Sequence, residues 1–195
     1  MPKIKAANVP EHRAAQRAAI LHSARLAILD GGLAALNFGA LAERTGLARP
    51  SVYEYFRTKS EIVIALILEE EMPAWRSRAA QALAKEMSPE AAIAAFVRAL
   101  LALVRSGHHE LPFVLAASEL DGDTQSAIAQ AHHQVFSLLA PHLAQIGVKD
   151  VEAGIELAAG VVMTAGQALR HTPKRRNLIE MAVTFTIGGL CACAR

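Results

Sequence analysis

The chain has 195 residues, of which 53% are hydrophobic and 19% are charged. This composition supplies enough apolar side chains for a sizeable core and excludes a disordered protein, which needs fewer apolar and more charged residues. The net charge of +2 is unevenly spread, because residues 1–59 hold nine Lys or Arg against four Asp or Glu, while the remainder holds eleven against fourteen. A basic N-terminal third favours a partner rich in phosphate, although a solvated basic face without any partner would give the same counts.

Helix-forming Ala and Leu dominate the chain, and neither strict polar–apolar alternation nor a hairpin signal is found. We therefore expect an all-α fold of about nine helices. The first expected helix covers about residues 11–30, with Leu21, Ala24 and Ile28 on its core face and a pair of glycines ending it.

Residues 37–59 predict two short helices joined by a tight turn. Leu41 lies on the first helix, Gly46 suits the left-handed backbone that ends it, and Val52 and Phe56 are spaced as the buried face of the second. Two short helices around a glycine turn indicate a helix-turn-helix. Polar side chains remain on the outer face of the second helix, as DNA docking needs. They are Arg49, Ser51, Glu54 and Tyr55, with Lys59 just beyond.

This segment resembles the DNA-binding region of the tetracycline-repressor (TetR) family of transcriptional regulators. The resemblance covers about the first 65 residues and departs from the family pattern at Ala48, where a capping Ser or Thr is common, and at Pro50, where a small residue such as Gly is common. A proline is well tolerated in a first helical turn. The matching residues are Ile20, Leu21, Ala24, Ile28, Gly31, Gly32, Leu41, Ala42, Gly46, Leu47, Val52, Tyr53, Tyr55, Phe56, Lys59, Ile62 and Val63.

The resemblance implies a three-helix DNA-binding domain at residues 1–60 and a helical effector-binding and dimerisation domain at residues 61–195. It implies a ligand-responsive regulator of transcription, a repressor released from a palindromic DNA operator by a small-molecule effector. We expect a cytoplasmic homodimer that is not an enzyme, needs no cofactor and does not associate with a membrane.

The expected DNA contacts divide into two kinds. Arg49 and Ser51 occupy the first turn of the recognition helix and are candidates for base contact, since Arg can bind guanine through two hydrogen bonds. Pro50 lies in the same turn. Glu54 either accepts a hydrogen bond from cytosine or lessens non-specific DNA binding by repelling phosphate. The resemblance implies phosphate contacts for Asn37, Tyr53, Tyr55 and Lys59, with ring packing inside the module as the alternative for Tyr53.

A long fourth helix is expected to start at Ser60 and to be kinked or interrupted at Pro73, which lacks the backbone donor of a regular helix. This helix would link the two domains mechanically, with Pro73 as a pivot. Arg76 and Arg78 beyond the proline either anchor its distal half or face solvent.

Further helices are expected from Ser88 to about Arg105, over residues 111–118, from Asp123 to about Gly147, from Asp150 to about His171 and over residues 174–190. The last helix is apolar over a wide arc and must be covered on more than one side, which predicts a dimer of paired terminal helices. The alternative is an ordinary monomeric core. The expected interface residues are Val161, Ile179, Val183 and Leu190.

A ligand pocket is implied by the resemblance, and its lining is expected among apolar residues with occasional polar neighbours. A Phe or Met at helical spacing more often belongs to a plain core than to a pocket, and the two polar candidates are more suggestive but could face solvent. The scarcity of aromatic and charged residues in the apolar stripes favours a largely apolar ligand. The candidates are Phe96, Leu100, Phe113, His133, Phe136, Met163 and Gln167.

Other chemistries find little support. The pairs His108, His109 and His132, His133 invite a metal site, but consecutive helical residues point about 100° apart and four-ligand spacing is absent, so no metal is expected. Cys191 and Cys193 are expected to be reduced and structural. No catalytic motif occurs. A cofactor-dependent helical enzyme and an architectural DNA-binding protein without an effector remain as alternatives.

Overall fold

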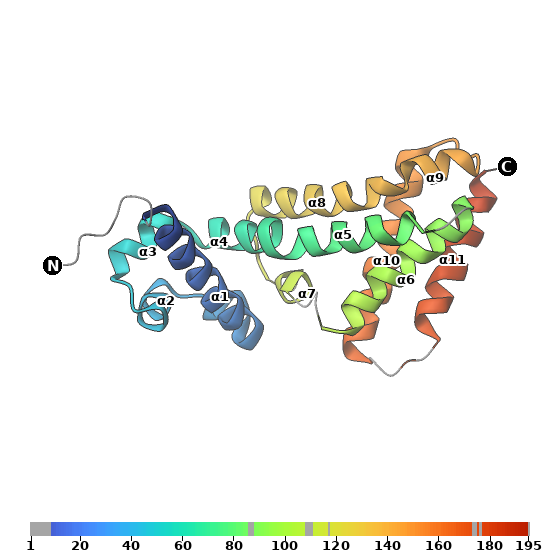
Figure 1. Ribbon diagram of the computed structural model, residues 1–195. Helices are drawn as coiled ribbons and strands as arrows, with labels where there is room; N and C mark the ends of the chain where they lie inside the picture. Colours follow the sequence, from blue (N-terminus) through green and yellow to red (C-terminus); the bar gives the residue numbers. More distant parts are fainter. Residues whose placement is uncertain are drawn as a thin grey trace. The chain divides into compact units, whose positions relative to one another are not determined.

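The computed structural model describes residues 9–85, 88–107, 111–116, 118–172, 175 and 177–194. These described residues form helices, turns and loops and contain no β-strand, which confirms the all-α prediction (Figure 1). Two runs of the chain change helix type without a loop between the parts. Counting each run as one helix gives nine helices in the described residues, as expected.

The chain divides into two compact units. The first contains Met1–Ile67 and Leu111–Gln125, and the second contains Leu68–Glu110 and Ser126–Arg195. The division of function at residues 60 and 61 that the sequence predicts stays a prediction.

In the first unit, α1 (Val9–Ala35) supplies the longest helix. Its backbone leaves helical geometry at Gly31 and again at Gly32, whose φ of 68° is left-handed. The regular helix therefore ends where the glycine pair was expected to end it. Ile20, Ala24 and Ile28 are fully buried on one face of this helix.

The helix-turn-helix follows directly. Asn37 caps α2 (Phe38–Thr45), because its side-chain oxygen accepts from the backbone N–H of Gly39 at 2.7 Å. Gly46 ends α2 with φ 68° and ψ 17°. α3 (Arg49–Tyr55) then starts without a side-chain cap at Ala48 and places Val52 in the core. Figure 1 shows α1, α2 and α3 gathered together.

The fourth helix begins one residue earlier than expected, because Thr58 rather than Ser60 is its N-cap. Thr58 accepts from the backbone N–H of Glu61, and the Glu61 carboxylate accepts from the backbone N–H of Arg57. This exchange resembles a capping box. α4 (Lys59–Ala65) continues into a π-helix, η2 (Leu66–Glu71), and then into α5 (Met72–Leu83).

Pro73 does not break this run of helix, which corrects the expected interruption. A proline removes one backbone donor and crowds the carbonyl four residues before it. The widened π turn immediately ahead of Pro73 accommodates that loss, so the chain stays helical through the proline.

The first unit also contains α7 (Leu111–Ala116), which packs on α1, and the start of α8 (Gly122–Phe136). Asp121, not the expected Asp123, caps α8 through the backbone N–H of Thr124 at 2.8 Å. The Asp121 carboxylate also accepts from the hydroxyls of Ser60 and Thr124. These hydrogen bonds, that from Ser60 foremost, lower the pKa of Asp121 to about 2.

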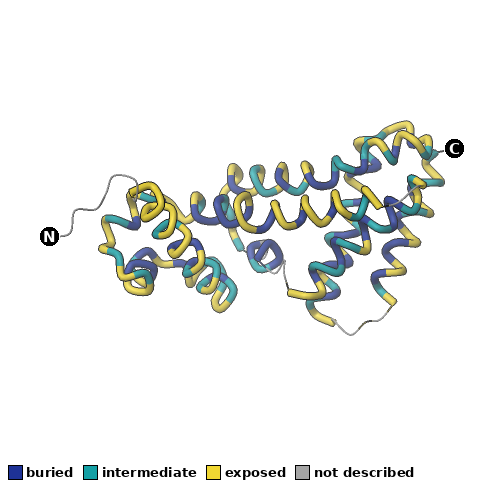
Figure 2. The backbone as a smooth tube through the Cα atoms, in the orientation of Figure 1, coloured by how far each residue is buried: buried dark blue, intermediate teal, exposed yellow. Residues whose placement is uncertain are grey.

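The second unit is built around α6 (Pro89–Arg105), which Ser88 caps as expected. α5, α9 (Ala140–Gln145), α10 (Val151–His171) and α11 (Leu178–Cys193) all contact α6. A 3-10 turn, η3 (Ser137–Leu139), joins α8 to α9 at Pro141. Asp150 caps α10, and α11 starts at Leu178 rather than near residue 174. Figure 2 shows buried residues along the inner sides of these helices and exposed ones outside.

By length and composition alone, α1 is the one described helix that could cross a membrane. It lies near the N-terminus, and its glycine break and buried Ile20, Ala24 and Ile28 show that it also serves as a core helix of the first unit. A core helix of a soluble protein passes the same test, so this is weak support for a membrane.

Candidate nucleic-acid interface and effector module

The recognition helix α3 separates buried from exposed side chains as the sequence predicts. Val52 is fully buried and Phe56 is 2% exposed, whereas Arg49 and Glu54 are exposed. Ser51 is half-buried in the first turn, beside exposed Pro50. Because the buried pair holds the helix against the unit, its polar residues face outward, where a DNA groove can reach them.

Tyr53 packs within the module, which was the alternative considered for it, and the phosphate contact stays a prediction. Its ring stacks on Phe38 with centroids 4.5 Å apart and planes 6° apart, so it packs within the module. The residue is nevertheless 40% exposed, and the Arg49 guanidinium carbon lies 5.9 Å from the ring centroid. The ring thus fixes a base-contact candidate while leaving the phenol edge accessible.

Tyr55 points back towards α1. Its hydroxyl donates to the side-chain oxygen of Gln16 at 2.7 Å, and the Arg13 guanidinium carbon lies 5.2 Å from its ring centroid. One turn further along α1, the Arg17 guanidinium carbon lies 5.0 Å from the Phe56 ring centroid. Sequence reasoning missed Arg13 and Gln16, since no local pattern links residues 39 positions apart.

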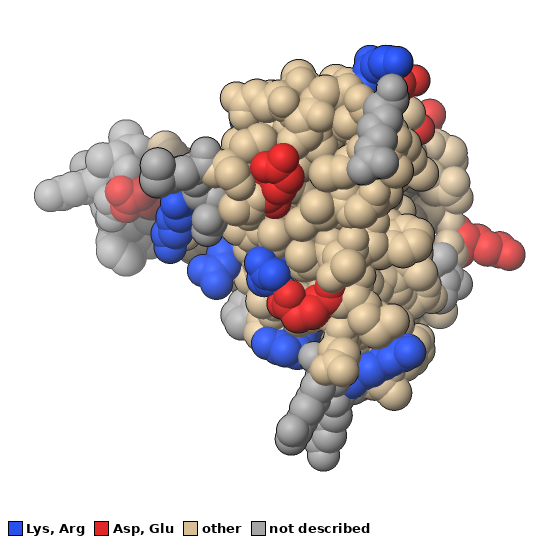
Figure 3. Space-filling view, turned by 90° about the vertical axis from the view of Figure 1, so that its right-hand side faces the viewer, with Lys and Arg blue, Asp and Glu red and all other residues tan. Residues whose placement is uncertain are grey.

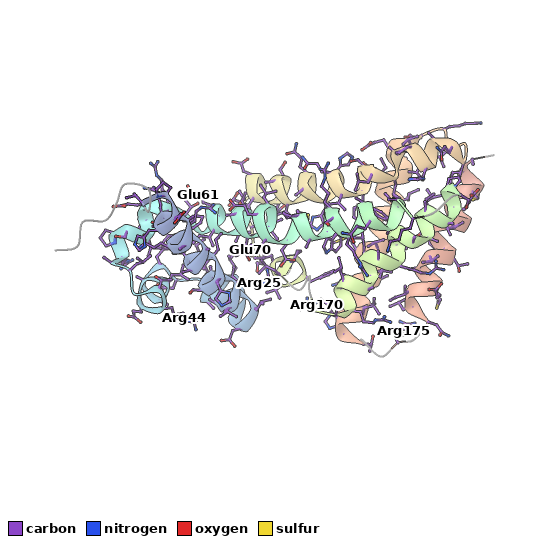
Figure 4. All side chains as sticks on the ribbon, viewed as in Figure 1. Arg25, Arg44, Glu61, Glu70, Arg170 and Arg175 are labelled. Carbon is purple, nitrogen blue, oxygen red and sulfur yellow. The ribbon has the colours of Figure 1, made fainter. Side chains whose placement is uncertain are left out.

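The remaining predicted phosphate contacts lie at helix starts. Asn37 is exposed and caps α2, and exposed Lys59 is the first residue of α4. Arg44 and Glu61, labelled in Figure 4, mark the end of α2 and the start of α4. All the predicted DNA-contact residues therefore belong to the first unit. Their contacts with DNA remain predictions.

In the second unit, three of the expected pocket residues lie in the core. Phe96, Leu100 and Phe136 are fully buried, and the rings of Phe96 and Phe136 meet edge-on with centroids 5.5 Å apart. Trp75, which is 1% exposed, extends the cluster with its ring centroid 6.4 Å from that of Phe136. The spacing of Met72, Trp75 and Ala79 could have indicated this buried face of α5.

The other expected pocket residues are spread out. His133 is exposed and its ring Nε2 lies 2.6 Å from a carboxylate oxygen of Glu152. Gln167 is exposed on α10, Met163 is half-buried, and Phe113 belongs to the first unit. Among the seven candidates, Phe96 and Phe136 are therefore in direct ring contact, and Leu100 is buried one helical turn from Phe96 on α6.

Three of the four predicted interface residues face inward, and the fourth, Val161, lines the open groove between α10 and α11. Ile179, Val183 and Leu190 are 8%, 3% and 2% exposed, so they pack inside the second unit, and Val161 is half-buried. On another side of α11, Met181 and Phe185 form an open stripe, with 57% and 72% exposure.

An apolar groove of about 640 Å³ runs between α10 and α11 on this open side. Leu157, which is 60% exposed, stands on its α10 wall, and Arg175 lines it as well (Figure 4). Figure 3 views the second unit from the side of α9 and α11 and shows a broad area without Lys, Arg, Asp or Glu. On α6 and α11, Arg98 binds Glu180 through two hydrogen bonds of 2.8 and 2.7 Å, which lower the Glu180 pKa.

The described residues hold no group of three or more His, Cys, Asp or Glu placed to bind a metal ion. His108, His109 and Glu110 lie outside the residues that the structure describes. Cys191 is half-buried and Cys193 exposed, and both are free thiols.

Residues 20–66 match the family model described as bacterial regulatory proteins, tetR family. No curated protein sequence matches the chain. Among solved structures, a TetR-family transcriptional regulator from Streptomyces coelicolor is similar at TM-score 0.75 and 17% identity, over 96% of both chains.

Two similar structures contain bound small molecules. The regulator FadR from Bacillus subtilis in complex with stearoyl-CoA is similar at TM-score 0.71 and 15% identity, over 91% of this chain and 99% of FadR. The SmeT–triclosan complex is similar at TM-score 0.68 and 16% identity, over 90% of this chain and 91% of SmeT. Residues 20–66 therefore match the tetR family model, and the chain shares the fold of TetR-family transcriptional regulators over 96% of its length.

Proposed function

We propose that this protein is a ligand-responsive DNA-binding repressor of transcription that leaves a palindromic operator when a small, largely apolar effector binds its second unit. The observation that carries the proposal is the division of α3. Val52 and Phe56 anchor the helix in the core, while Arg49 and Glu54 are exposed on its outer face. A short helix so anchored presents its first-turn Arg to base edges in a major groove.

A homodimer through α10 and α11 completes the proposal. The groove between these helices exposes Leu157, Met181 and Phe185, which a second copy would cover. Three exposed glycines on the same helices support a close partner. A Cβ added at Gly160, Gly188 or Gly189 would meet nothing within 4 Å. Glycine costs a helix interior about 1 kcal/mol relative to alanine, and the protomer itself gains no space from it there.

A two-fold dimer predicts a two-fold operator, with half-sites set by the distance between the recognition helices. Selection from random-sequence duplexes tests this directly. We expect the bound pool to converge on an inverted repeat. Convergence on no sequence would instead support the alternative of an architectural DNA-binding protein.

The effector proposal is supported by the buried aromatic cluster of Trp75, Phe96 and Phe136 in the second unit. Two similar structures hold stearoyl-CoA and triclosan, molecules with large apolar parts. Both compounds are useful first probes for weakened operator binding. A ligand shifts the equilibrium only if it prefers one conformation, so a compound that binds without altering DNA affinity is not the effector.

We further propose that the protein acts in the cytoplasm, needs no cofactor and is not an enzyme. The competing hypothesis of a helical enzyme requires a bound cofactor for difficult chemistry. Native mass spectrometry of the purified protein distinguishes the two, because a stoichiometric cofactor mass would favour the enzyme.

A further inference from the structure

The first turns of α1 pack on the end of the recognition helix, although they precede the family match at residues 20–66. Arg13 lies against the Tyr55 ring and Arg17 against the Phe56 ring, at 5.2 and 5.0 Å from the ring centroids. Residues four apart share one face of a helix. This face of α1 therefore brings a row of cations to the end of α3 that lies next to Lys59.

The hydroxyl of Tyr55 already donates a hydrogen bond within the protein. It carries a single proton, and that proton is donated to Gln16 Oε1 at 2.7 Å. A DNA phosphate oxygen can only accept a hydrogen bond, so this hydroxyl cannot serve it while the bond to Gln16 persists. The phosphate role that the family resemblance implies for Tyr55 thus has no donor in this arrangement.

Arg13 is placed to supply that donor. Its side chain is exposed, and among the described residues it pairs with no acidic group. A guanidinium stacked on a ring uses its face for the contact and keeps its N–H edge directed outward. That edge can bind two phosphate oxygens at once, and the ring limits the rotamers that must be frozen on binding.

We propose that Arg13 contacts the DNA backbone, that the Tyr55 ring is the platform that positions it, and that Gln16 holds the platform in place. The DNA-binding surface then extends from α3 onto the first turns of α1. This inference rests on the proposed DNA binding. A phosphate contact carries no sequence information, so its effect is the same on every duplex.

The test measures affinity for a mixed-sequence duplex at several salt concentrations. Each phosphate contact adds about 0.9 to the slope of log K against log salt concentration. We expect Arg13→Ala to lower the slope by about this amount and to weaken binding roughly ten-fold near 0.1 M salt. Arg13→Lys retains the charge and should retain the slope. Arg105→Ala, a matched loss of charge in the second unit, should leave the slope unchanged.

Two substitutions at Tyr55 distinguish the contribution of its ring to DNA binding from that of its hydroxyl. Tyr55→Phe keeps the platform and should leave the slope as in the wild type. Tyr55→Ala removes the platform. In that variant, Arg13→Ala should then weaken DNA binding by a smaller factor than it does in the wild-type protein.

Two results would overturn the inference. In the first, Arg13→Ala leaves the slope unchanged, even if it lowers the melting temperature, because a purely structural stacking role predicts that pattern. In the second, Tyr55→Phe lowers the slope by about one phosphate, which would assign the contact to the hydroxyl. If the wild-type protein binds no duplex at all, the proposed function itself fails, which is a different outcome.

Discussion

The rings of the recognition helix α3 and the exposed ring of α11 have different neighbours. In the first unit, the rings of Tyr53, Tyr55 and Phe56 each have an arginine guanidinium carbon within 6 Å, at 5.9, 5.2 and 5.0 Å. In the second unit, Phe185 is 72% exposed beside an apolar groove. Rings flanked by cations suit a surface that meets phosphate, whereas a bare ring suits one that meets another apolar surface. This difference agrees with the proposed DNA-binding surface in the first unit and the proposed dimer surface in the second.

The largest expected effect comes from a charge placed on the buried side of α11. Val183 is 3% exposed, so Val183→Glu buries a charge inside the second unit. We expect it to destabilise the protomer by about 4 kcal/mol or more, rather than to give folded monomers. Urea unfolding followed by circular dichroism measures this. A folded, stable Val183→Glu monomer would show that Val183 belongs to the subunit interface after all.

Phe185→Glu should instead give folded monomers. Phe185 stands on the open stripe, where a charge stays solvated in the protomer but blocks burial in a dimer. Loss of a central aromatic contact costs about 2 kcal/mol or more, which raises the dimer dissociation constant at least ~30-fold. Sedimentation velocity measures the change. Gln145→Glu adds the same charge at an exposed position on α9, outside the groove, and should leave the dimer intact.

This pair of substitutions also shows where sequence reasoning stops. Helical spacing identifies two apolar stripes on α11, but spacing alone gives no reason to prefer either for the protomer core. Packing against α6 and α10 decides, and it turns Ile179, Val183 and Leu190 inward. The helix-turn-helix was predictable because Gly46, Val52 and Phe56 act through local backbone geometry and near neighbours.

Helix caps give a finer example of the same limit. The sequence predicts helix starts at Ser60 and Asp123, but the capping residues in the structure are Thr58 and Asp121. The reason lies in tertiary contact, since the Ser60 hydroxyl donates to the Asp121 carboxylate, 61 residues away in the sequence. Contacts at such separation, like that of Gln16 with Tyr55, leave no periodic signal.

On the DNA side, Arg49→Ala should relax preference at one base pair. A bidentate arginine–guanine contact contributes roughly 1–3 kcal/mol of discrimination. The measurement compares affinities for the selected operator and for single-base variants of it. Arg44→Ala, an equal loss of charge on the exposed end of α2, should weaken all duplexes alike. Equal losses for Arg49→Ala on every duplex would make it a phosphate contact.

A smaller effect is expected at the π-helix. Pro73→Ala restores a backbone donor and so favours a regular α-helix over the π turn of η2. The coupling factor is the ratio of the operator affinities measured without and with effector. We expect it to change several-fold, within the usual ~1–3 kcal/mol of allosteric coupling. The operator affinity without effector should stay the same. Operator titrations with and without effector measure this.

Pro89→Ala is the matched control for that experiment. Pro89 is the first residue of α6, where a missing N–H has no helical partner in any case. If both alanine variants keep the wild-type coupling factor, η2 and Pro73 are not the element that responds to the effector.

The smallest expected effect is a pH dependence at Asp121. Its ordinary pKa of 3.8 falls to about 2 in the folded protein, chiefly because the Ser60 hydroxyl donates to its carboxylate. A carboxyl whose pKa is lower in the folded state stabilises the fold fully above its unfolded pKa and loses that contribution as the pH falls towards the folded value. The stabilising contribution of Asp121 is therefore lost between about pH 4 and about pH 2.

Asp121→Asn isolates this group, because asparagine resembles the protonated acid. Wild type should be the more stable protein at pH ~5, and the gap in urea midpoint should narrow as the pH approaches ~2. Other carboxyl groups titrate in both proteins and cancel in the difference. Asp123→Asn controls for the loss of one negative charge near the start of α8. A gap that stays constant from pH ~5 to pH ~2 would mean that the Ser60 and Thr124 hydroxyls do not favour the ionised carboxylate.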